Sequence, residues 1–329
     1  MKIKKLHIKN FKSIADLEII EPNPFTVFVG PNGSGKSNIF EALEFFVNPI
    51  YQEDKARLFG GKENILNRIN IDKESSILIE SDKFPYEHST LFHNKSSKKP
   101  LYFLDDFDGS EDLLPEQKYA LDDFMNSFRR LFIKNLEKQK INFYDDLSLS
   151  FSGNNLEKVL KRILKDEFKR EEIGEWLDLF IPGYDKVEIE SNELSGTDTL
   201  LMYEKGIDKP FTKELISDGS YSILCLLTVV LQSDEPQFLC IEEPENGLTP
   251  YVIREMVTFF RNACEEKGHY IWLNTHSQSL VSELSGNEII TVNKRNGQTL
   301  IKQFKDEDLH GLRTDEAWLT NVLGGGLPW

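Results

Sequence analysis

The sequence predicts an α/β fold, and three features of its 329 residues point to it. A glycine-rich loop at 30–37 stands between an apolar, strand-like run at 25–29 and a helical pattern that starts near Ser37. A second apolar run, 238–243, ends in two carboxylates, and a third, 269–273, leads into a polar tetrapeptide. Strand-like runs that alternate with helical patterns are typical of an α/β protein.

The first 24 residues alternate apolar and polar side chains, which predicts antiparallel strands that lead into the glycine-rich loop. Polar turns at 10–13 and 21–24 separate these strands. The start is basic, but it alternates instead of running into an apolar block. We therefore expect a strand there and no signal peptide.

Residues 30–37 read GPNGSGKS and satisfy each constrained position of a phosphate-binding loop. Glycines let the backbone curl so that its N–H groups point at phosphate oxygens, and the next helix adds the positive partial charge of its N-terminus. Lys36 is expected to reach the β- and γ-phosphates, and the Ser37 hydroxyl to ligate Mg²⁺. The residues that we predict to contact the nucleotide here are Asn32, Gly33, Ser34, Gly35, Lys36, Ser37 and Asn38.

The run 238–243 predicts a buried strand that ends in adjacent acids. In a protein with a phosphate-binding loop, we expect Glu242 to support Mg²⁺ and Glu243 to polarise the water that attacks the γ-phosphate. A surface pair of glutamates at a strand end is the alternative. The next strand ends near His276, which we expect to hydrogen-bond the γ-phosphate or the attacking water, with a purely structural histidine as the alternative.

A serine-glycine turn precedes the apolar helical run 221–231. It forms a second anion site, because N–H groups at a helix N-terminus attract negative charge. One nucleotide does not easily use this turn together with the loop of the same chain. A head-to-tail homodimer resolves the conflict, since each subunit then offers Ser217 and Gly219 to the γ-phosphate held by its partner.

Between about 84 and 183 the chain turns polar, aromatic and helical, so we expect a helical insertion. Helical spacing of apolar residues runs through 115–140 and again through 156–180. The insertion lacks sustained heptads. A long coiled-coil arm is therefore absent or reduced to a stub.

Composition and charge limit the partners of this chain. The formal net charge of −16 disfavours coating of nucleic acid through overall charge. Two basic segments, 93–99 and 129–134, are candidates for nucleic-acid contact, and a solvated charged face is the alternative for both. No apolar run approaches the roughly 18 to 20 residues that a membrane helix needs, and the three cysteines have no metal-binding spacing. We expect a cytoplasmic protein without a membrane partner.

In this order the motifs resemble the ABC-type, AAA-family ATPase heads of the SMC, RecF and overcoming-lysogeny-defect group. The matching stretches are the opening strand and turn at 3–14, Walker A at 30–37, the signature at 217–220, Walker B at 238–243, the D-loop at 244–248 and the switch histidine at 275–277. The resemblance implies a bilobed ABC ATPase head in which ATP, with Mg²⁺, drives closure of a dimer. The expected parts are an N-terminal head part at 1–84, the helical insertion at 85–183, a C-terminal head part at 184–300 and a tail at 301–329.

The sequence of residues 242–248 is especially similar to that of small bacterial ATPases of the overcoming-lysogeny-defect type. Such ATPases are often encoded beside a Toprim-like nuclease in phage-defence loci. The resemblance implies an ATP-hydrolysing switch that controls a separate effector. Only a strand pair and a short tail follow the switch histidine, so we expect any nuclease on another protein. Two features depart from the family pattern: no Q-loop glutamine can be placed, and Asp218 stands where many transport ATPases have glycine.

Two other functions remain open. One is a DNA-repair or chromosome-associated ATPase that acts directly on DNA, and the other is a nucleotide-bound scaffold with negligible turnover. The insertion and the tail are the expected output surfaces. The tail carries apolar side chains that would anchor a partner or, alternatively, pack on their own head: Trp318, Leu319, Val322, Leu323 and Trp329.

Overall fold

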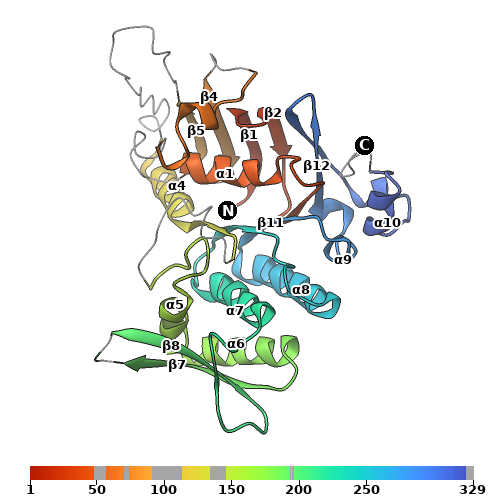
Figure 1. Cartoon of the computed structure of the whole chain (residues 1–329). Coiled ribbons are helices and arrows are strands. Elements are labelled where there is room, and N and C mark those ends of the chain that lie inside the picture. The colour runs from red at the N-terminus through yellow and green to blue at the C-terminus, as the bar shows by residue number, and fades with distance from the viewer. Residues whose placement is uncertain are drawn as a thin grey trace. The chain divides into compact units, whose positions relative to one another are not determined.

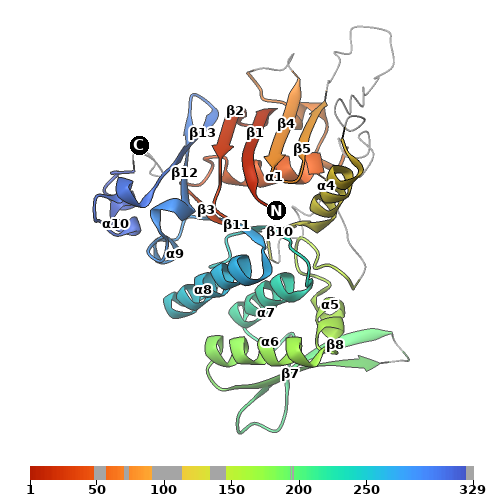
Figure 2. The same cartoon turned by 180° about the vertical axis from the view of Figure 1, so that it is seen from behind.

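The computed structural model describes residues 1–47, 57–69, 74–90, 113–133, 146–192, 194 and 196–323. The chain forms two compact units. The first comprises Met1–Arg130, Gln237–Cys240 and Gly268–Trp329, and the second comprises Leu131–Pro236 and Ile241–Lys267. Each unit is assembled from stretches far apart in the sequence, and Figures 1 and 2 show their elements from two sides.

A four-stranded antiparallel sheet opens the first unit. Its order is β2 (Ile14–Ile20), β1 (Ile3–Phe11), β4 (Ser75–Ser81) and β5 (Pro85–Thr90), as Figure 1 shows. Leu6 lies opposite Ile19 on one side and Ile79 on the other, so three strands bury one apolar face. The expected antiparallel N-terminal strands are confirmed.

The second sheet has six strands and contains the strand that leads into the glycine-rich loop. Its order is β13 (Gln298–Gln303), β12 (Ile289–Arg295), β3 (Phe25–Val29), β11 (Tyr270–Thr275), β10 (Phe238–Glu242) and β6 (Phe128–Leu131) (Figure 2). Both β11 and β12 run parallel to β3, which places the C-terminal ends of these three strands at one edge. Every residue of β3 is buried, as expected for a strand covered on both faces.

Helix α1 (Lys36–Val47) follows the loop and packs on the four-stranded sheet (Figure 1). Its apolar side chains join the core of the first unit, where the Phe45 ring lies 5.7 Å from Phe11 and 5.1 Å from Phe59. The remaining described elements of this unit are short or peripheral. They are α3 (Lys62–Ile65), α4 (Pro115–Ser127), α9 (Gln278–Val281), η2 (Gly286–Glu288), η3 (Asp306–Leu309) and α10 (Thr314–Leu319).

Two strands lie where the sequence predicted helical structure. β5 pairs with β4, and β6 begins directly after α4, which ends at Ser127 instead of continuing toward residue 140. The ring of Phe128 packs on Phe238, 5.6 Å between centroids. Apolar residues spaced for a helix also fit a short strand, and tertiary packing decided for the strand. Residues 134–140 lie outside the described part of the chain.

The second unit is built around helix α7 (Asp218–Leu231), whose residues from Tyr221 onward are all buried. Helices α5 (Leu156–Ile163) and α6 (Glu167–Phe180) pack against it, and α8 (Pro250–Lys267) packs on α6 (Figure 2). A three-stranded antiparallel sheet, β7 (Tyr184–Asn192), β8 (Thr197–Glu204) and β9 (Phe211–Thr212), completes the unit. A helix that is apolar all round is expected at such a buried position.

The helical pattern at 156–180 forms two helices. After α5 ends at Ile163, the Asp166 carboxylate caps α6 by accepting a hydrogen bond from the Lys169 N–H (3.2 Å). This break resets the helical phase. Phe168, which we expected on the apolar face, is therefore 82% exposed.

The three cysteines, Cys225, Cys240 and Cys264, are free thiols inside the fold. Within the described ranges, no cluster of three His, Cys, Asp or Glu side chains is arranged to hold a metal ion. In the same ranges, no helix combines the length and the apolarity needed to cross a membrane.

Candidate nucleotide-binding site

The glycine-rich loop lies between β3 and α1. Its backbone turns at Ser34, whose N–H donates to the Pro31 carbonyl (3.2 Å). The Lys36 ammonium donates to the carbonyl oxygens of Gly30 (2.6 Å) and Pro31 (3.1 Å). Because Lys36 is buried, its positive charge is held at the loop, where it strengthens attraction for an anion.

The glycines let the loop backbone lie close to β12 and β13 on one side, and they leave the other side of the loop open. A Cβ on Gly35, whose φ is +103°, would lie 2.0 Å from Thr299 Oγ1, and a Cβ on Gly30 would lie 2.1 Å from the Val292 carbonyl oxygen. At Gly33, beyond its chain neighbours, no heavy atom of a described residue lies within 4 Å of the Cβ position. A phosphate therefore has room to approach the backbone at Gly33.

A chain of hydrogen bonds braces the loop from outside. The Asn38 amide donates to Ser13 Oγ (2.6 Å), which shares a hydrogen bond with Thr299 Oγ1 (2.6 Å). Thr299 Oγ1 in turn donates to the Ser34 carbonyl (3.0 Å). Such a chain holds each donor in one orientation. The Asn38 side chain, which we expected at the nucleotide, thus contributes to the support of the loop.

Ser34 offers a further test of whether the loop fits a phosphate. Its hydroxyl is buried, and Oγ has no hydrogen-bond partner among the residues that the structure describes. A buried polar group left in this way costs about 1–3 kcal/mol. A phosphate oxygen would satisfy it, and the Lys36 ammonium nearby on the loop would compensate the negative charge. The residues present therefore fit a nucleotide phosphate.

Strand β11 brings a second set of polar residues to the end of β3. Because the two strands are parallel, Asn274 lies opposite Phe28. Asn274 is buried, and its amide nitrogen lies 3.4 Å from Ser37 Oγ. His276 follows as an exposed residue at the end of the same strand. The first unit thus joins Ser37 to the strand that carries the predicted switch histidine.

The two acids at the end of β10 have different surroundings. Glu242 is buried, whereas Glu243 is partly exposed and adopts φ +48°, in the left-handed region that residues other than glycine rarely occupy. The Asn246 amide donates to Glu243 Oε2 (3.0 Å), and the Asn246 N–H donates to the Glu243 carbonyl (3.2 Å). Glu243 is therefore the first residue of a tight turn, and Asn246 of the same turn binds both its carboxylate and its carbonyl.

The predicted signature turn begins helix α7. Ser217 is the N-cap residue, and its Oγ accepts a hydrogen bond from the Ser220 N–H (3.0 Å). A Cβ on Gly219 would lie 2.5 Å from the Gly247 carbonyl oxygen, so the two backbones touch. The second unit therefore brings the signature turn together with the turn that follows Glu243.

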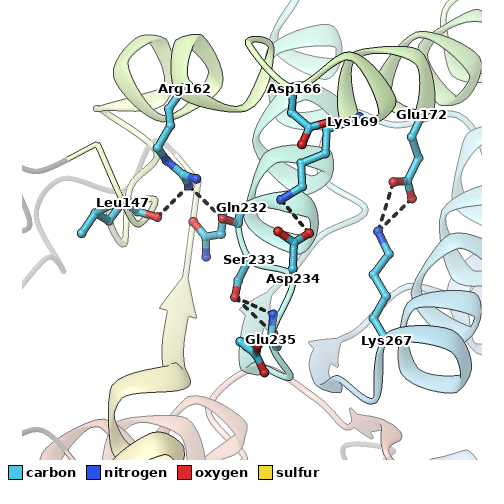
Figure 3. Close-up of polar contacts among 10 residues, drawn as sticks. All are labelled: Leu147, Arg162, Asp166, Lys169, Glu172, Gln232, Ser233, Asp234, Glu235 and Lys267. Carbon is cyan, nitrogen blue, oxygen red and sulfur yellow. Dashed lines mark hydrogen bonds and ion pairs between the residues drawn. The ribbon is translucent and has the colours of Figure 1, made fainter.

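Polar contacts tie the other end of α7 to α5 and α6 (Figure 3). The Arg162 guanidinium donates to the carbonyl of Gln232, the C-cap residue of α7 (2.8 Å). Lys169 pairs with Asp234 just beyond it (2.8 Å). A cation at a helix C-terminus satisfies a free carbonyl and complements the helix dipole. Near the start of the helix, burial raises the pKa of Tyr221.

The second unit also contains a groove of about 960 Å³. Side chains from α6, including Arg170 and Glu171, and from the β7–β8 hairpin, including Lys186 and Tyr203, line it. None of the residues that we predict to contact the nucleotide lines this groove. Its walls carry both signs of charge, which does not favour a triphosphate.

The basic segments give a mixed outcome. Arg130, in the candidate segment 129–134, is buried and pairs with Glu44 (2.6 Å). The Arg129 guanidinium donates to two backbone carbonyls, including that of Asn126 (2.6 Å). The two arginines of this segment therefore bind within the fold, and its third basic residue, Lys134, lies outside the described residues. The segment 93–99 lies outside the described residues.

Sequence reasoning did not find four polar residues that contact predicted site residues: Ser13, Asn274 and Thr299 in the first unit and Asn246 in the second. Ser13, Asn246 and Asn274 lie in or next to a recognised motif. The sequence therefore indicated their segments, but it did not indicate which residues they contact. Thr299 carries no such signal. It lies 265 positions from the loop residue that it contacts, and only the sheet brings the two together.

A family model described as "AAA domain, putative AbiEii toxin, Type IV TA system" matches residues 25–282, which include the loop, the signature turn and the acidic strand. The chain is 54% identical to the chromosome partition protein Smc of Methanocaldococcus jannaschii over 43 residues, 13% of this chain and 4% of that protein. It is 26% identical to structural maintenance of chromosomes protein 4 of Saccharomyces cerevisiae over 251 residues, 75% of this chain and 15% of that protein.

The chain thus spans only a small part of these two relatives. Among solved structures, an Smc head bound to the C-winged helix domain of ScpA superposes with a TM-score of 0.62 and 17% identity, covering 93% of this chain and 98% of that chain. At this identity the similarity shows the fold alone. The chain belongs to the AAA domain family described as putative AbiEii toxin, and it has the α/β fold of an ABC/SMC-type ATPase head.

Proposed function

We propose that this chain is an ABC-type ATPase that binds MgATP, dimerises head to tail, hydrolyses ATP to ADP and phosphate, and so switches a separate effector. The glycine-rich loop is the main support for this proposal. Backbone carbonyls hold the Lys36 ammonium in place, Ser37 lies beside Asn274, and a phosphate has room to approach the backbone at Gly33. Bound Mg²⁺ would neutralise phosphate charge and orient the γ-phosphate for in-line attack.

Each predicted site residue has one role in this reaction. The backbone N–H groups of 32–38 and the Lys36 ammonium bind the phosphates. Ser37 and Glu242 hold Mg²⁺ through oxygen atoms, the donors that this ion prefers. Glu243 accepts the proton of the attacking water, and His276 hydrogen-bonds the γ-phosphate or that water.

The partner subunit completes the site through its signature turn. Ser217 Oγ accepts a hydrogen bond from the Ser220 N–H and shares another with Ser220 Oγ (2.9 Å). With Ser220 as the donor in the second bond, the Ser217 hydroxyl donates to a phosphate oxygen. The first N–H groups of α7, including that of Gly219, add further donors and the positive end of the helix. Two such sites form in a homodimer with twofold symmetry.

The proposed effector is a Toprim-like nuclease in bacterial phage defence. One observation supports a separate effector: the similar Smc head is bound to a domain of another protein, ScpA. The proposed output surfaces are the insertion at 85–183 and the tail at 301–329. Leu319 and Val322 are exposed, whereas Trp318 and Leu323 pack on the first unit, and 324–329 lie outside the described residues.

A second candidate is an SMC- or RecF-like ATPase that acts directly on DNA, and the similarity to two chromosome proteins favours it. Copurification from the native operon, with nuclease assays with and without ATP, separates the two candidates. A copurified nuclease under ATP control supports the switch. DNA binding by the chain alone, weakening steeply with salt, supports the second candidate.

Lys36→Ala tests the loop assignment. Loss of charged hydrogen bonds worth about 1.5–3 kcal/mol should weaken ATP binding by roughly 10- to 100-fold or more. Equilibrium titration with a fluorescent ATP analogue measures this change. Lys205→Ala, which removes an exposed lysine paired with Asp178, is the matched control and should bind as the wild type does. Unchanged affinity in Lys36→Ala contradicts the assignment.

Glu243→Gln tests the general base. The variant should bind ATP normally, lose about 100- to 10,000-fold in kcat and accumulate as an ATP-bound dimer. Light scattering with and without ATP detects that dimer, and phosphate release gives kcat. Hydrolysis at the wild-type rate would place the base elsewhere.

Ser217→Arg tests the arrangement across two subunits. Alone, it should bind ATP but not turn it over, because the bulky cation blocks the partner's γ-phosphate. Mixed with Lys36→Ala, it should regain activity, since one intact loop then faces one intact signature turn. A mixture without any rescue argues against the composite site.

A further inference from the structure

The groove of about 960 Å³ in the second unit lies along one edge of strand β7. All residues of the strand from Tyr184 to Glu190 line it. Successive side chains of a strand point to opposite faces of the sheet, so a groove over one face would be lined by every second residue. Lining by consecutive residues therefore means that the groove follows the backbone edge of β7.

That edge has no neighbouring strand within the described residues. β7 is the first strand of its three-stranded sheet and pairs with β8 alone. In an antiparallel pair, every second residue directs its N–H and C=O away from the partner strand, and such groups pair readily with a further extended chain. From Lys186 to Glu190, β7 keeps a regular register with β8 and lines the groove. This length of about 17 Å accommodates about five residues of an extended peptide.

The two faces beside this edge differ in chemistry. On the buried face, Val187 lies opposite Met202 and Ile189 lies opposite Leu200. The other face of β7 is exposed and carries charged side chains: Lys186, Glu188 and Glu190. A strand added to β7 would direct its side chains alternately to these two faces. Its sequence should therefore alternate apolar and charged residues.

Helix α6 forms the opposite wall of the groove, and Gly174 lies in the middle of that helix. The helix packs on β7 (Figure 2). Glycine inside a helix is less favourable than alanine. Here no close packing requires it, because no heavy atom of a described residue outside the helix backbone and the chain neighbours lies within 4 Å of the Cβ position. The missing side chain instead leaves room between α6 and β7.

The charges along the groove favour a basic chain. Lys186 pairs with Glu188 (2.7 Å), and its ammonium lies over the Tyr203 ring (4.4 Å). Three acids of the groove have no ion pair within the described part of the chain: Glu171, Asp185 and Glu190. These acids oppose pairing of β7 with the same strand of a second copy, because like charges across two strands repel each other. They attract basic side chains.

We propose that this groove binds an extended peptide segment of a partner protein, which adds a strand to the free edge of β7. The segment alternates apolar side chains, directed to the buried face beside α6, with basic side chains on the face of Glu190. Hydrogen bonds between the main chains provide affinity, and the alternation provides selectivity. The inference goes beyond the proposed ATPase, because none of the predicted nucleotide contacts lines the groove and peptide binding needs no nucleotide.

A labelled peptide tests the addition of a strand. The probe is a seven-residue peptide of alternating valine and lysine with a fluorescein label, and fluorescence anisotropy with the full chain, without nucleotide, measures its Kd. Two control peptides keep its composition and charge. One has its valines and lysines in separate blocks, and the other is N-methylated throughout, which removes its backbone donors.

Both control peptides should bind about tenfold more weakly than the probe, or weaker still. Equal binding of all three peptides would reflect only attraction to an acidic protein and would overturn the proposal. So would the absence of probe binding at about 1 mM, where even a weak complex is detected. In that case the edge of β7 excludes further strands.

Hydrogen exchange locates the bound peptide. Amides at the free edge of β7 become hydrogen-bonded when a strand is added. Exchange in the segment 184–192 should therefore slow by about tenfold when the probe is present at ten times its Kd. Exchange in α7 should stay unchanged. Protection of other segments without protection of β7 overturns the assignment to this edge.

Gly174→Leu should fill the groove. Because leucine favours a helix and the position is open, the unfolding midpoint should equal or exceed that of the wild type. The Kd of the probe should nevertheless rise by about tenfold. Glu175→Leu is the matched control, since it adds the same side chain at the next, exposed position outside the groove. Wild-type affinity in Gly174→Leu contradicts a peptide bound beside α6.

Glu190→Lys tests the selection of basic side chains. It should weaken binding of the probe by about 3- to 10-fold and strengthen binding of the same peptide with glutamates in place of lysines. Glu175→Lys changes the net charge equally outside the groove, and it should alter either Kd by less than about twofold. Equal effects of the two substitutions would show that the groove does not select a basic partner.

Discussion

Helices α1 and α7 both begin at a turn proposed to contact phosphate, but their polar anchors differ. Helix α1 has two buried carboxylates, Glu41 paired with Lys12 (2.5 Å) and Glu44 paired with Arg130. Helix α7 has no charged side chain along its buried length and has its ion pair beyond its C-terminus, where Asp234 is 82% exposed. The buried ion pairs of α1 are thus costly to break, whereas the ion pair beyond the end of α7 can be replaced by water, and α7 itself is held by its buried side chains.

This difference between buried and exposed ion pairs indicates which part of the molecule can change shape. Buried charges and the hydrogen bonds behind the loop hold it in one conformation, the one proposed to bind a phosphate. Exposed ion pairs contribute little to stability, so the pair of Lys169 with Asp234 at the end of α7 can rearrange at small cost. A switch needs one rigid site and one element that moves easily.

Arg130→Ala should have the largest effect on stability. Removing the cation beside the buried Glu44 carboxylate should lower the free energy of unfolding by about 3–5 kcal/mol. Urea denaturation, with hydrogen exchange of α1 peptides, measures the loss. The double variant Arg130→Met with Glu44→Leu should recover most of it. If Arg130→Ala unfolds like the wild type, the contrast between the two helices is lost.

Thr299→Val should come second, with a loss of about 1–3 kcal/mol, because the Ser34 carbonyl and Ser13 lose their link. ATP affinity should fall as well, since the loop loses its brace. The matched control is Thr291→Val on neighbouring β12, where the buried hydroxyl has no hydrogen-bond partner within the described part of the chain. Equal effects of the two substitutions, in denaturation and in ATP titration, would rule out a special role for Thr299.

Lys169→Ala should cost less than about 1 kcal/mol, since its partner Asp234 is mostly in water. Lys267→Ala, which breaks the pair with Glu172 shown in Figure 3, should behave alike. Both losses should vanish near 1 M salt, where the Debye length is about 3 Å. Hydrogen exchange of α7 peptides at two salt concentrations is the measurement, and a salt-independent loss would place these pairs in the buried class.

Asp198→Asn should have the smallest effect, and it should depend on pH. Hydrogen bonds from Lys161 (2.8 Å) and Ser191 (2.7 Å) lower the pKa of Asp198 in the folded state. A lowered pKa stabilises the fold at neutral pH, and this contribution is lost as pH falls below about 3.9. The gap in Tm between wild type and variant should therefore narrow from pH 7 to pH 3. A constant gap would argue against the ion pair.

The contrast between α4 and the loop shows how far sequence reasoning reaches. Spacing predicted a helix through 115–140, yet the chain becomes a strand at Phe128, because the packing of that ring on Phe238 outweighs local preference. The glycine-rich loop was placed correctly between its strand and helix, since consecutive residues define the motif. The roles of Glu243, His276 and Ser217 stay predictions until the variants are measured.

The sequence by itself determined the order of strand, loop and helix, the position of each phosphate motif and the α/β class, because these follow from residues close together in the chain. Only the tertiary structure decided the brace through Thr299, the buried pair of Glu44 with Arg130 and the contact of Gly219 with Gly247. Such contacts join residues far apart in the sequence, and sheet order, register and packing create them, which local spacing does not encode.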